Sequence, residues 1–258
     1  MEQIYSYRNG IVEPHNAALP REFPLRLTVN GREIATLVAS PHDLRFLVAG
    51  FLRLQGFAES LDDFLILSVC EDYGIANVRV RKELPERLEP VLTSGCGTGV
   101  TFTIPAAPEQ RAPFLVDSKK IFTPAEIFAV MDQLSRQADK YRCHGGIHSA
   151  AVADGGEILL YAEDIGRHNT IDRLAGEALL KGIDLSGKLL VTSGRVSSEM
   201  AAKSALLGIS LIASRTSPTD MAVKICRQAG IALVGYVRGG RFSIYSHREG
   251  FLVEVDNL

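Results

Sequence analysis

The pattern of apolar and polar positions changes near the middle of the chain. In the first 80 residues, short runs alternate between apolar and polar residues as strands do, and Asn30-Gly31 between two of them is a strong signal for a two-residue hairpin turn. Apolar residues at helical spacing occur between Leu44 and Leu52, and Gly56 follows as a stop signal. The expected elements are strands at 26–29, 33–38, 64–70 and 77–80 and one helix that starts near 44. They predict a small, mixed and β-rich N-terminal region.

The second half of the chain alternates between strands and helices. It opens with Thr123-Pro124 and Glu126, which predict a capping box and a helix to about residue 141. Asn169 is the expected N-cap of the next helix, and Ser217-Pro218 the expected start of the last one. The expected strands are 147–153, 158–163, 189–192, 209–213, 231–237 and 241–245. This order predicts an α/β fold, a three-layer arrangement with mostly parallel strands and helices on both faces of the sheet.

Prolines mark the expected division between these two parts. Pro105, Pro108 and Pro113 follow one another closely and predict an exposed connection. We therefore expect an N-terminal region at 1–113 and an α/β domain at 114–258.

Composition and charge exclude several classes of function. The 258 residues are 46% hydrophobic, enough for a full core, and 28 basic against 30 acidic residues give no field that would attract nucleic acid or a membrane surface. The chain has no apolar run of 18 residues and no signal peptide, so we expect a cytoplasmic protein. The four cysteines are scattered without a C-x-x-C pair, which disfavours a zinc ribbon, a dithiol centre or disulfides.

One cysteine has a distinctive setting. Cys96 lies in L-T-S-G-C-G-T-G at 92–99, where the glycines allow backbone N–H groups to converge on an anion such as a thiolate. Such a setting lowers the pKa of a thiol and makes it nucleophilic. A tight turn with an incidental buried cysteine is the alternative interpretation.

Arginines follow four of the expected strands: Arg167, Arg195, Arg215 and Arg238. Ligands of open α/β sheets bind beyond the carboxyl ends of the strands, so these side chains predict a crevice for a polyanion such as phosphate or pyrophosphate. Solvated surface charges are the alternative for any single one of them. A metal site near Cys143, His144 and His148 is disfavoured, because Gly145-Gly146 argues against a helix there and the deaminase zinc signature is missing.

Four motifs carry a resemblance to a known family. They are H-G-G-I-H-S-A-A at 144–151, E-D-I-G-R-H-N-T-I-D at 163–172, T-S-G-R-V-S-S-E at 192–199 and Y-V-R-G-G-R at 236–241. In these motifs the chain resembles the FdhD family of formate dehydrogenase accessory sulfurtransferases. The resemblance implies a cytidine-deaminase-like fold without zinc, a homodimer, and transfer of sulfur from a cysteine desulfurase to the molybdenum cofactor before it enters formate dehydrogenase.

The resemblance also assigns roles to individual residues. Cys96 takes the position of the cysteine that carries persulfide sulfur. The C-terminal motif is the implied binding site for molybdopterin guanine dinucleotide: Tyr236, Val237, Arg238, Gly239, Gly240 and Arg241, with Arg167 and Arg195 as further candidates. No directly bound metal ion is expected.

Two positions depart from the family pattern. Gly99 replaces the second cysteine of the loop, and His144 replaces a threonine. Single-cysteine chemistry is sufficient to accept and release sulfur. The alternatives are a cofactor-binding chaperone without sulfur transfer, a nucleotide deaminase-like enzyme, and a structural partner of formate dehydrogenase.

Overall fold

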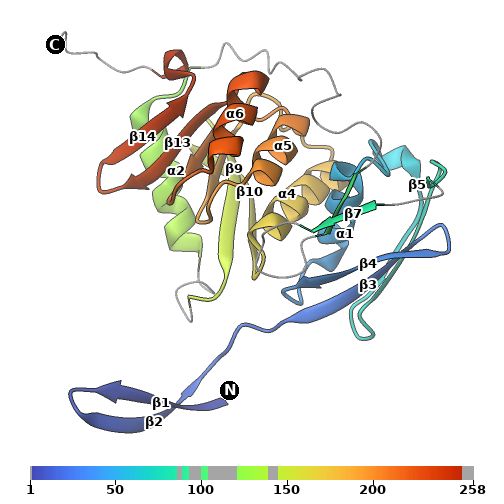
Figure 1. Ribbon diagram of the computed structural model, residues 1–258, viewed down its shortest axis with the longest axis horizontal. Coiled ribbons are helices and arrows are strands. Elements are labelled where there is room, and N and C mark those ends of the chain that lie inside the picture. The colour runs from blue at the N-terminus through green and yellow to red at the C-terminus, as the bar shows by residue number, and fades with distance from the viewer. Residues whose placement is uncertain (1, 86–88, 93–99, 104–120, 139–144, 252–258) are drawn as a thin grey trace.

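The computed structural model describes residues 2–85, 89–92, 100–103, 121–138 and 145–251, and shows a large α/β body beside a smaller β-rich part (Figure 1). The smaller part and its connections contain β1 (Glu2–Arg8), β2 (Ile11–Ala17), β3 (Phe23–Val29), β4 (Arg32–Ala39), α1 (Leu44–Leu54), η1 (Leu61–Asp63), β5 (Phe64–Cys70), β6 (Ile75–Val80), β7 (Glu89–Leu92) and β8 (Val100–Thr103). The α/β body contains α2 (Pro124–Gln137), β9 (His148–Asp154), β10 (Glu157–Asp164), α4 (Arg167–Lys181), β11 (Leu189–Thr192), α5 (Ser198–Leu206), β12 (Leu211–Ser214), α6 (Asp220–Ala229), β13 (Ala232–Arg238), β14 (Arg241–Ser246) and η2 (Arg248–Gly250).

The smaller part is a four-stranded sheet covered by α1. Its strand order is β4-β3-β6-β5, and Asn30 and Gly31 both have positive φ in the turn from β3 to β4, as the sequence predicts. Leu25 and Leu27 on β3 are fully buried against the apolar face of α1. The predicted β-rich N-terminal region is therefore confirmed.

The large sheet has six strands in the order β10-β9-β11-β12-β13-β14. Side chains alternate across it: Ala151 and Val191 pack with α2, whereas Val152 and Leu190 pack with the helices on the opposite face. Figure 1 shows α2 on one side of the sheet and α4, α5 and α6 on the other. The predicted α/β fold with helices on both faces is confirmed.

The prediction of mostly parallel strands is wrong. β11–β12 and β12–β13 are parallel, but β10–β9, β9–β11 and β13–β14 are antiparallel. Gly155-Gly156 and Gly239-Gly240 close tight hairpins with positive φ at each glycine. So short a connection can join only antiparallel strands, because a parallel pair needs a longer crossover, and here α5 and α6 supply the crossovers.

The structure confirms one of the predicted helix caps and differs from the prediction at two others. The capping box of Thr123 and Glu126 is present, although α2 ends at Gln137. The predicted N-cap at Asn169 is wrong, because α4 already starts at Arg167 after Gly166. Thr219, two residues beyond the predicted start, caps α6, since Pro218 forms a β-bridge with Val196.

The predicted boundary between 1–113 and 114–258 lies outside the described residues and stays a prediction. Separately, no helix in the described ranges is long and apolar enough to cross a membrane.

Helices α1 and α4 cross at two glycines, and this contact joins the two parts. A Cβ added to Gly50 would lie 1.6 Å from the carbonyl oxygen of Asp172, and one added to Gly176 would lie 1.9 Å from that of Phe46. Real Cβ atoms do not approach so closely, so only glycine permits this distance between the helices. The crossing fixes α1 on the helix that begins at the carboxyl end of β10.

We expect Gly50→Ala to destabilise the fold. Alanine favours a helix by about 1 kcal/mol over glycine, but separating two packed helices costs about 1–3 kcal/mol or more. The melting temperature should therefore fall by several degrees in differential scanning calorimetry. Arg45→Ala, on the exposed side of the same helix, is the control and should change the melting temperature little. An unchanged melting temperature for Gly50→Ala would show that the crossing is loose.

Candidate functional site

The carboxyl ends of four strands meet at one edge of the large sheet. β10, β11, β12 and β13 run in the same direction, because β9 is antiparallel to both β10 and β11 and the remaining pairs are parallel. His148, at the start of β9, is paired with Asp164, at the end of β10, and so lies at the same edge. This is the edge at which the sequence placed a ligand site.

A buried ion pair closes one end of this edge. Asp164 is fully buried and accepts hydrogen bonds from Nε and Nη2 of Arg173, at 2.9 and 2.6 Å. Its carboxylate also accepts from the backbone N–H groups of Ser40 and Gly166, at 3.1 and 2.9 Å. The amide of Asn169 donates to the other carboxylate oxygen at 2.8 Å. Asn169 therefore satisfies a buried charge rather than capping a helix.

A second buried network joins α4 to α5. Lys203 Nζ lies 2.8 Å from Asp172 and 2.9 Å from Glu199. Glu199 lies 3.7 Å from Nδ1 of His168, and Nε2 of His168 is 2.8 Å from Oγ of Ser197. The two motifs at 163–172 and 192–199, far apart in the sequence, thus meet through side chains.

Burial controls protonation in this network. Burial raises the pKa of Asp172 to about 6, although the Lys203 ammonium acts in the opposite direction. Burial opposes the charge on Lys203, but the carboxylates of Asp172 and Glu199 outweigh it and raise the pKa of Lys203. The pair is therefore ionised at neutral pH.

Two imidazoles at this edge are neutral at pH 7. Burial lowers the pKa of His168 to about 4, and the Glu199 carboxylate offsets this only in part. Burial, with the nearby Arg167 guanidinium, also lowers the pKa of His148. Neutral imidazoles can accept a hydrogen bond, and Nε2 of His168 already lies 2.8 Å from Oγ of Ser197.

The four arginines lie at the same edge of the sheet but differ in burial and direction. Arg167 is buried, and a Cβ added to Gly194 would lie 3.0 Å from its Cβ. Arg215 Nη1 donates to Oγ of Ser135 on α2, at 3.1 Å, so this side chain turns to the α2 face. Arg195 and Arg238 are exposed. All four arginines therefore lie at strand ends, as the sequence predicts, and Arg215 is directed to α2. That they bind a polyanion stays a prediction.

Residues 236–241 form an exposed hairpin tip with a strained residue. Tyr236 has φ 56° beside a register shift between β13 and β14, and its N–H donates to the carbonyl of Thr216 at 3.0 Å. Positive φ is costly for a bulky side chain and often marks a functional position. The tyrosine ring is 41% exposed and lies 5.7 Å from the guanidinium carbon of Arg238.

The tip separates the predicted ligand residues into two groups. Arg238, Gly239, Gly240 and Arg241 are exposed, and the paired positions of the two arginines flank the two-glycine turn. Val237 is 1% exposed and packs in the core with α2, so it supports the tip instead of facing a ligand. An anionic ligand with a planar ring would fit this tip, because the tip carries an aromatic ring, two guanidinium groups and the N–H groups of two glycines.

Cys96, Gly99, Cys143 and His144 lie outside the described residues. The strands β7 and β8 that flank the Cys96 segment are antiparallel, with Leu92 paired to Val100. Within the described ranges, no group of three or more His, Cys, Asp or Glu side chains could hold a metal ion.

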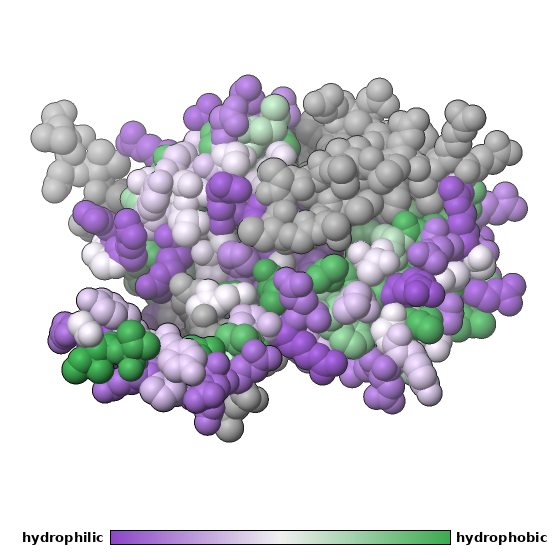
Figure 2. Space-filling model, turned by 60° about the horizontal axis from the view of Figure 1, so that its bottom comes forward, coloured by the Kyte–Doolittle hydropathy of each residue, from purple (hydrophilic) through white to green (hydrophobic). Residues whose placement is uncertain are grey.

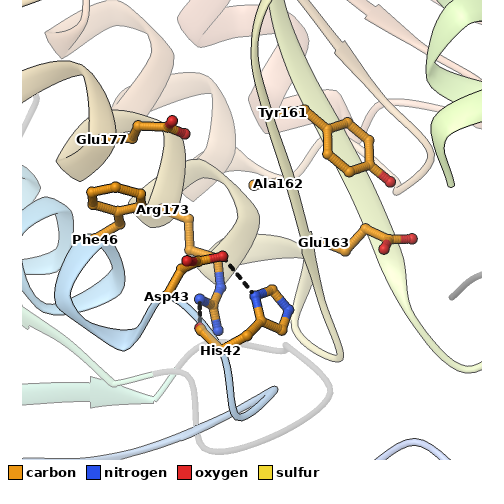
Figure 3. Close-up of a pocket in the computed structure, with 8 residues that line it drawn as sticks. All are labelled: His42, Asp43, Phe46, Tyr161, Ala162, Glu163, Arg173 and Glu177. Atoms are coloured by element: carbon orange, nitrogen blue, oxygen red, sulfur yellow. Dashed lines mark hydrogen bonds and ion pairs between the residues drawn. The ribbon is translucent and has the colours of Figure 1, made fainter. Parts of the chain in front are cut away.

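A small pocket lies away from the tip, between α1, β10 and α4 (Figure 3). Its volume is about 140 Å³, and its lining residues are His42, Asp43, Phe46, Tyr161, Ala162, Glu163, Arg173 and Glu177. Sites for drug-sized ligands and cofactors usually measure about 300–1,000 Å³, so this pocket is too small for a dinucleotide. Sequence reasoning missed this pocket and the Lys203 network, because residues that meet only through the crossing of α1, α4 and α5 leave no local signal.

The fold and the edge together define a class: an α/β protein with neutral imidazoles and exposed arginines at the carboxyl edge of a mixed sheet. The FdhD/NarQ family profile matches residues 20–252, and the chain belongs to this family. It is 34% identical over 254 residues to the sulfur carrier protein FdhD of Staphylococcus haemolyticus, with 96% of this chain and 95% of that protein covered. It is also 34% identical over 252 residues to the protein of the same name from Staphylococcus aureus strain JH9, with 96% and 94% covered.

A solved structure shows the same fold. The crystal structure of a protein described as a formate dehydrogenase accessory protein, from Desulfotalea psychrophila, superposes with a TM-score of 0.77. The match covers 97% of this chain and 98% of that one at 24% sequence identity. The structure shares the fold, and the profile and the two relatives confirm the family resemblance seen in the four motifs.

We expect His168→Gln to reduce the acid sensitivity of the fold. The folded pKa of about 4 lies below the ordinary value of 6.5, so between these values the unfolded chain binds a proton that the folded protein does not. Stability therefore falls as the pH decreases, by about 2 kcal/mol at pH 5 from this residue alone. Glutamine does not titrate, so the variant should lose less free energy of unfolding in urea between pH 7 and pH 5.

The control for this measurement is His15→Gln, which changes an exposed imidazole on β2. It should keep the pH dependence of the wild type. The same pH dependence in all three proteins would contradict a buried, neutral His168.

Proposed function

We propose that this protein is a sulfur carrier needed for formate dehydrogenase activity. It accepts persulfide sulfur from a cysteine desulfurase on Cys96 and transfers that sulfur to the molybdenum cofactor before insertion. The observation that carries the proposal is the match to relatives named sulfur carrier protein FdhD, which covers 96% of this chain. Under this proposal it is a cytoplasmic sulfurtransferase that acts as a homodimer with formate dehydrogenase and the desulfurase as partners.

The first chemical step needs one nucleophilic thiolate. The Cys96 thiolate attacks the outer sulfur of a persulfide on the desulfurase, a new S–S bond forms on Cys96, and the desulfurase cysteine leaves as a thiolate. The glycines at 95, 97 and 99 in the sequence support this role, because glycine permits the backbone conformations in which N–H groups converge on an anion. With Gly99 in place of a second loop cysteine, no adjacent thiol competes for the sulfur.

The cofactor is the substrate of the second step, and we propose that the tip at 236–241 binds it as molybdopterin guanine dinucleotide. Arg238 and Arg241 supply positive charge for the pyrophosphate, and the exposed ring of Tyr236 supplies an aromatic face. Arg195 is exposed at the same edge and is a further candidate contact. Arg167 is the other candidate; it is buried beside Gly194, where an added Cβ would lie 3.0 Å from its Cβ.

A chaperone that binds the cofactor without sulfur transfer is the second candidate, and Gly99 is the observation that favours it. The two candidates differ in one measurable property. Both bind the guanine dinucleotide, but only the sulfur carrier forms a persulfide on Cys96.

We expect Cys96 to take up one sulfur atom when the protein is incubated with a cysteine desulfurase and cysteine. Intact mass and peptide mapping should find the added sulfur on Cys96 in the wild type and in Cys143→Ser, and none in Cys96→Ala. Sulfur that survives in Cys96→Ala but disappears in Cys143→Ser would move the carrier role to Cys143. No added sulfur in a wild type that still binds guanine nucleotide would favour the chaperone.

We expect Arg238→Ala to weaken binding of GDP, used as a probe for the guanine dinucleotide, by at least about tenfold. A hydrogen bond to a charged group contributes about 1.5–3 kcal/mol, and about 1.4 kcal/mol corresponds to a factor of ten. Isothermal titration calorimetry measures the affinity. Arg79→Ala removes an exposed arginine from β6 on the other sheet and should leave binding unchanged. Equal affinities for wild type and Arg238→Ala would exclude the tip as the site.

A further inference from the structure

A hairpin at the start of the chain extends away from the rest of the molecule. This N-terminal arm consists of β1 and β2, joined by Asn9-Gly10, which both have positive φ. Figure 1 shows it below the body, connected by an extended segment. In the described part of the chain, β1 and β2 pair only with each other, and nearly all their residues are exposed. The arm therefore gains little from the body of its own chain.

One face of the arm is apolar. Tyr5 pairs with Pro14 and Tyr7 with Val12, so these four side chains lie on the same face. Tyr5 is 67% exposed, Tyr7 75% and Val12 61%. Figure 2, in which the underside comes forward, shows apolar surface at the projecting end at the lower left. A two-stranded hairpin is at best marginally stable alone, so this one needs further strands or a cover.

The two edges of the arm differ in their capacity to add a strand. Proline is tolerated in a strand where its missing N–H would face away from the paired neighbour. Pro14 is in the middle of β2 and is paired with Tyr5, so its ring occupies the outer edge of β2 and blocks hydrogen bonding there. β1 contains no proline. The outer edge of β1 is the one open to another strand.

The charges on β1 identify which strand fits. Glu2 and Arg8 occupy the two ends of β1, with Tyr5 midway between them. In an antiparallel pair of two β1 strands centred on Tyr5, Glu2 faces the partner's Arg8 and Arg8 faces the partner's Glu2. A parallel pair would instead place like charges beside each other, which is unfavourable.

We propose that two copies of this chain associate through β1, which pairs antiparallel with the β1 of the second copy across a two-fold axis at Tyr5. The product is a four-stranded sheet in the order β2-β1-β1-β2, with both Pro14 edges outside. Its apolar face combines Tyr5, Tyr7, Val12 and Pro14 of both copies. The contact is self-complementary, as a closed two-fold interface requires.

This inference rests on the homodimer of the proposed function, and it identifies β1 as the surface through which the two copies associate. The segment between the arm and β3 passes close to the candidate site: a Cβ added to Gly146 would lie 2.6 Å from Cγ of Pro20. Gly146 is two residues before His148 in the sequence. The arm therefore leaves the body at the carboxyl edge of the large sheet, and pairing of two arms anchors each copy beside its own site.

Charge reversal tests the pairing. By symmetry, Glu2→Arg or Arg8→Glu replaces two attractive contacts per dimer by two repulsive ones, and we expect the dimer dissociation constant to rise about tenfold for either variant. The double variant Glu2→Arg/Arg8→Glu restores both attractive contacts and should return the constant close to that of the wild type. Sedimentation velocity over a range of concentrations of the full chain measures it.

Cysteine cross-linking tests the register independently, in a Cys70→Ser background because Cys70 is exposed. Tyr5→Cys lies on the two-fold axis and should form a disulfide with its copy in the partner under mild oxidation, which peptide mapping identifies. Tyr7→Cys is the matched control. It lies four residues along the strand from its own copy, about 14 Å away, which is beyond the reach of a disulfide.

Three results of these experiments would overturn the proposal, and a fourth, given below, would also contradict it. The first is a wild type that is monomeric at all concentrations. The second is a dimer dissociation constant that neither charge reversal changes, and the third is equal cross-linking through residues 5 and 7. The second result would leave the homodimer in place and exclude only the arm as its interface. If the protein is a monomer and needs the arm to bind the desulfurase or formate dehydrogenase, that result would also contradict self-pairing. Sulfur labelling of Cys96 is measured separately, so failure of the arm is distinguishable from failure of the proposed function.

Discussion

The buried charge of Asp164 is the constraint on which the rest of the site depends. A carboxylate that is fully buried must be neutralised and hydrogen-bonded. Here the donors come from two segments far apart in the chain: Arg173 and Asn169 of α4, and the backbone of Ser40 before α1. The Arg173 guanidinium also donates to the carbonyl of Ser40 at 2.8 Å, so it ties the entry to α1 to the same point. Removal of one partner from such a pair typically costs about 3–5 kcal/mol, because the other charge stays buried. The glycine crossing of α1 and α4 brings Ser40, before α1, to this buried pair.

The hydrogen-bonded Asp164 pair helps to explain how the carboxyl edge of the sheet can hold neutral imidazoles beside cations. His168 is adjacent in sequence to Arg167 and is fixed by Ser197 and Glu199, while Lys203 balances the acidic side of the network. A buried histidine that remains neutral does not add to the positive field of the edge, which leaves that field to the arginines. The exposed arginines are thus available to a ligand, and the buried ones serve the scaffold. The distinction follows from burial and not from residue type.

Strain and exposure are concentrated in the hairpins at the margins of the molecule. The tip at 236–241 combines a tyrosine at positive φ with two exposed arginines, and the N-terminal arm exposes two tyrosines that the described part of the chain does not cover. A stable core permits such features, because the cost of a strained residue or an exposed aromatic face is small beside the packing of three buried clusters. Both hairpins close on glycine-containing turns, which keeps their geometry defined even where their side chains face solvent.

The sequence by itself determined what local chemistry controls. Asn30-Gly31 specifies its turn, Thr123 and Glu126 specify a capping box, and the apolar periodicity specifies the helices and strands and so the α/β class. Only the tertiary structure decided the order of the strands in each sheet and the direction of those that no tight turn joins. It also decided that Asn169 serves a buried carboxylate, that Arg215 turns to α2, and that Lys203 joins Asp172 to Glu199. These outcomes depend on desolvation and on contacts between segments far apart in the chain. A buried charge must be hydrogen-bonded, and the packing of the helices decides which donors lie close enough to do so.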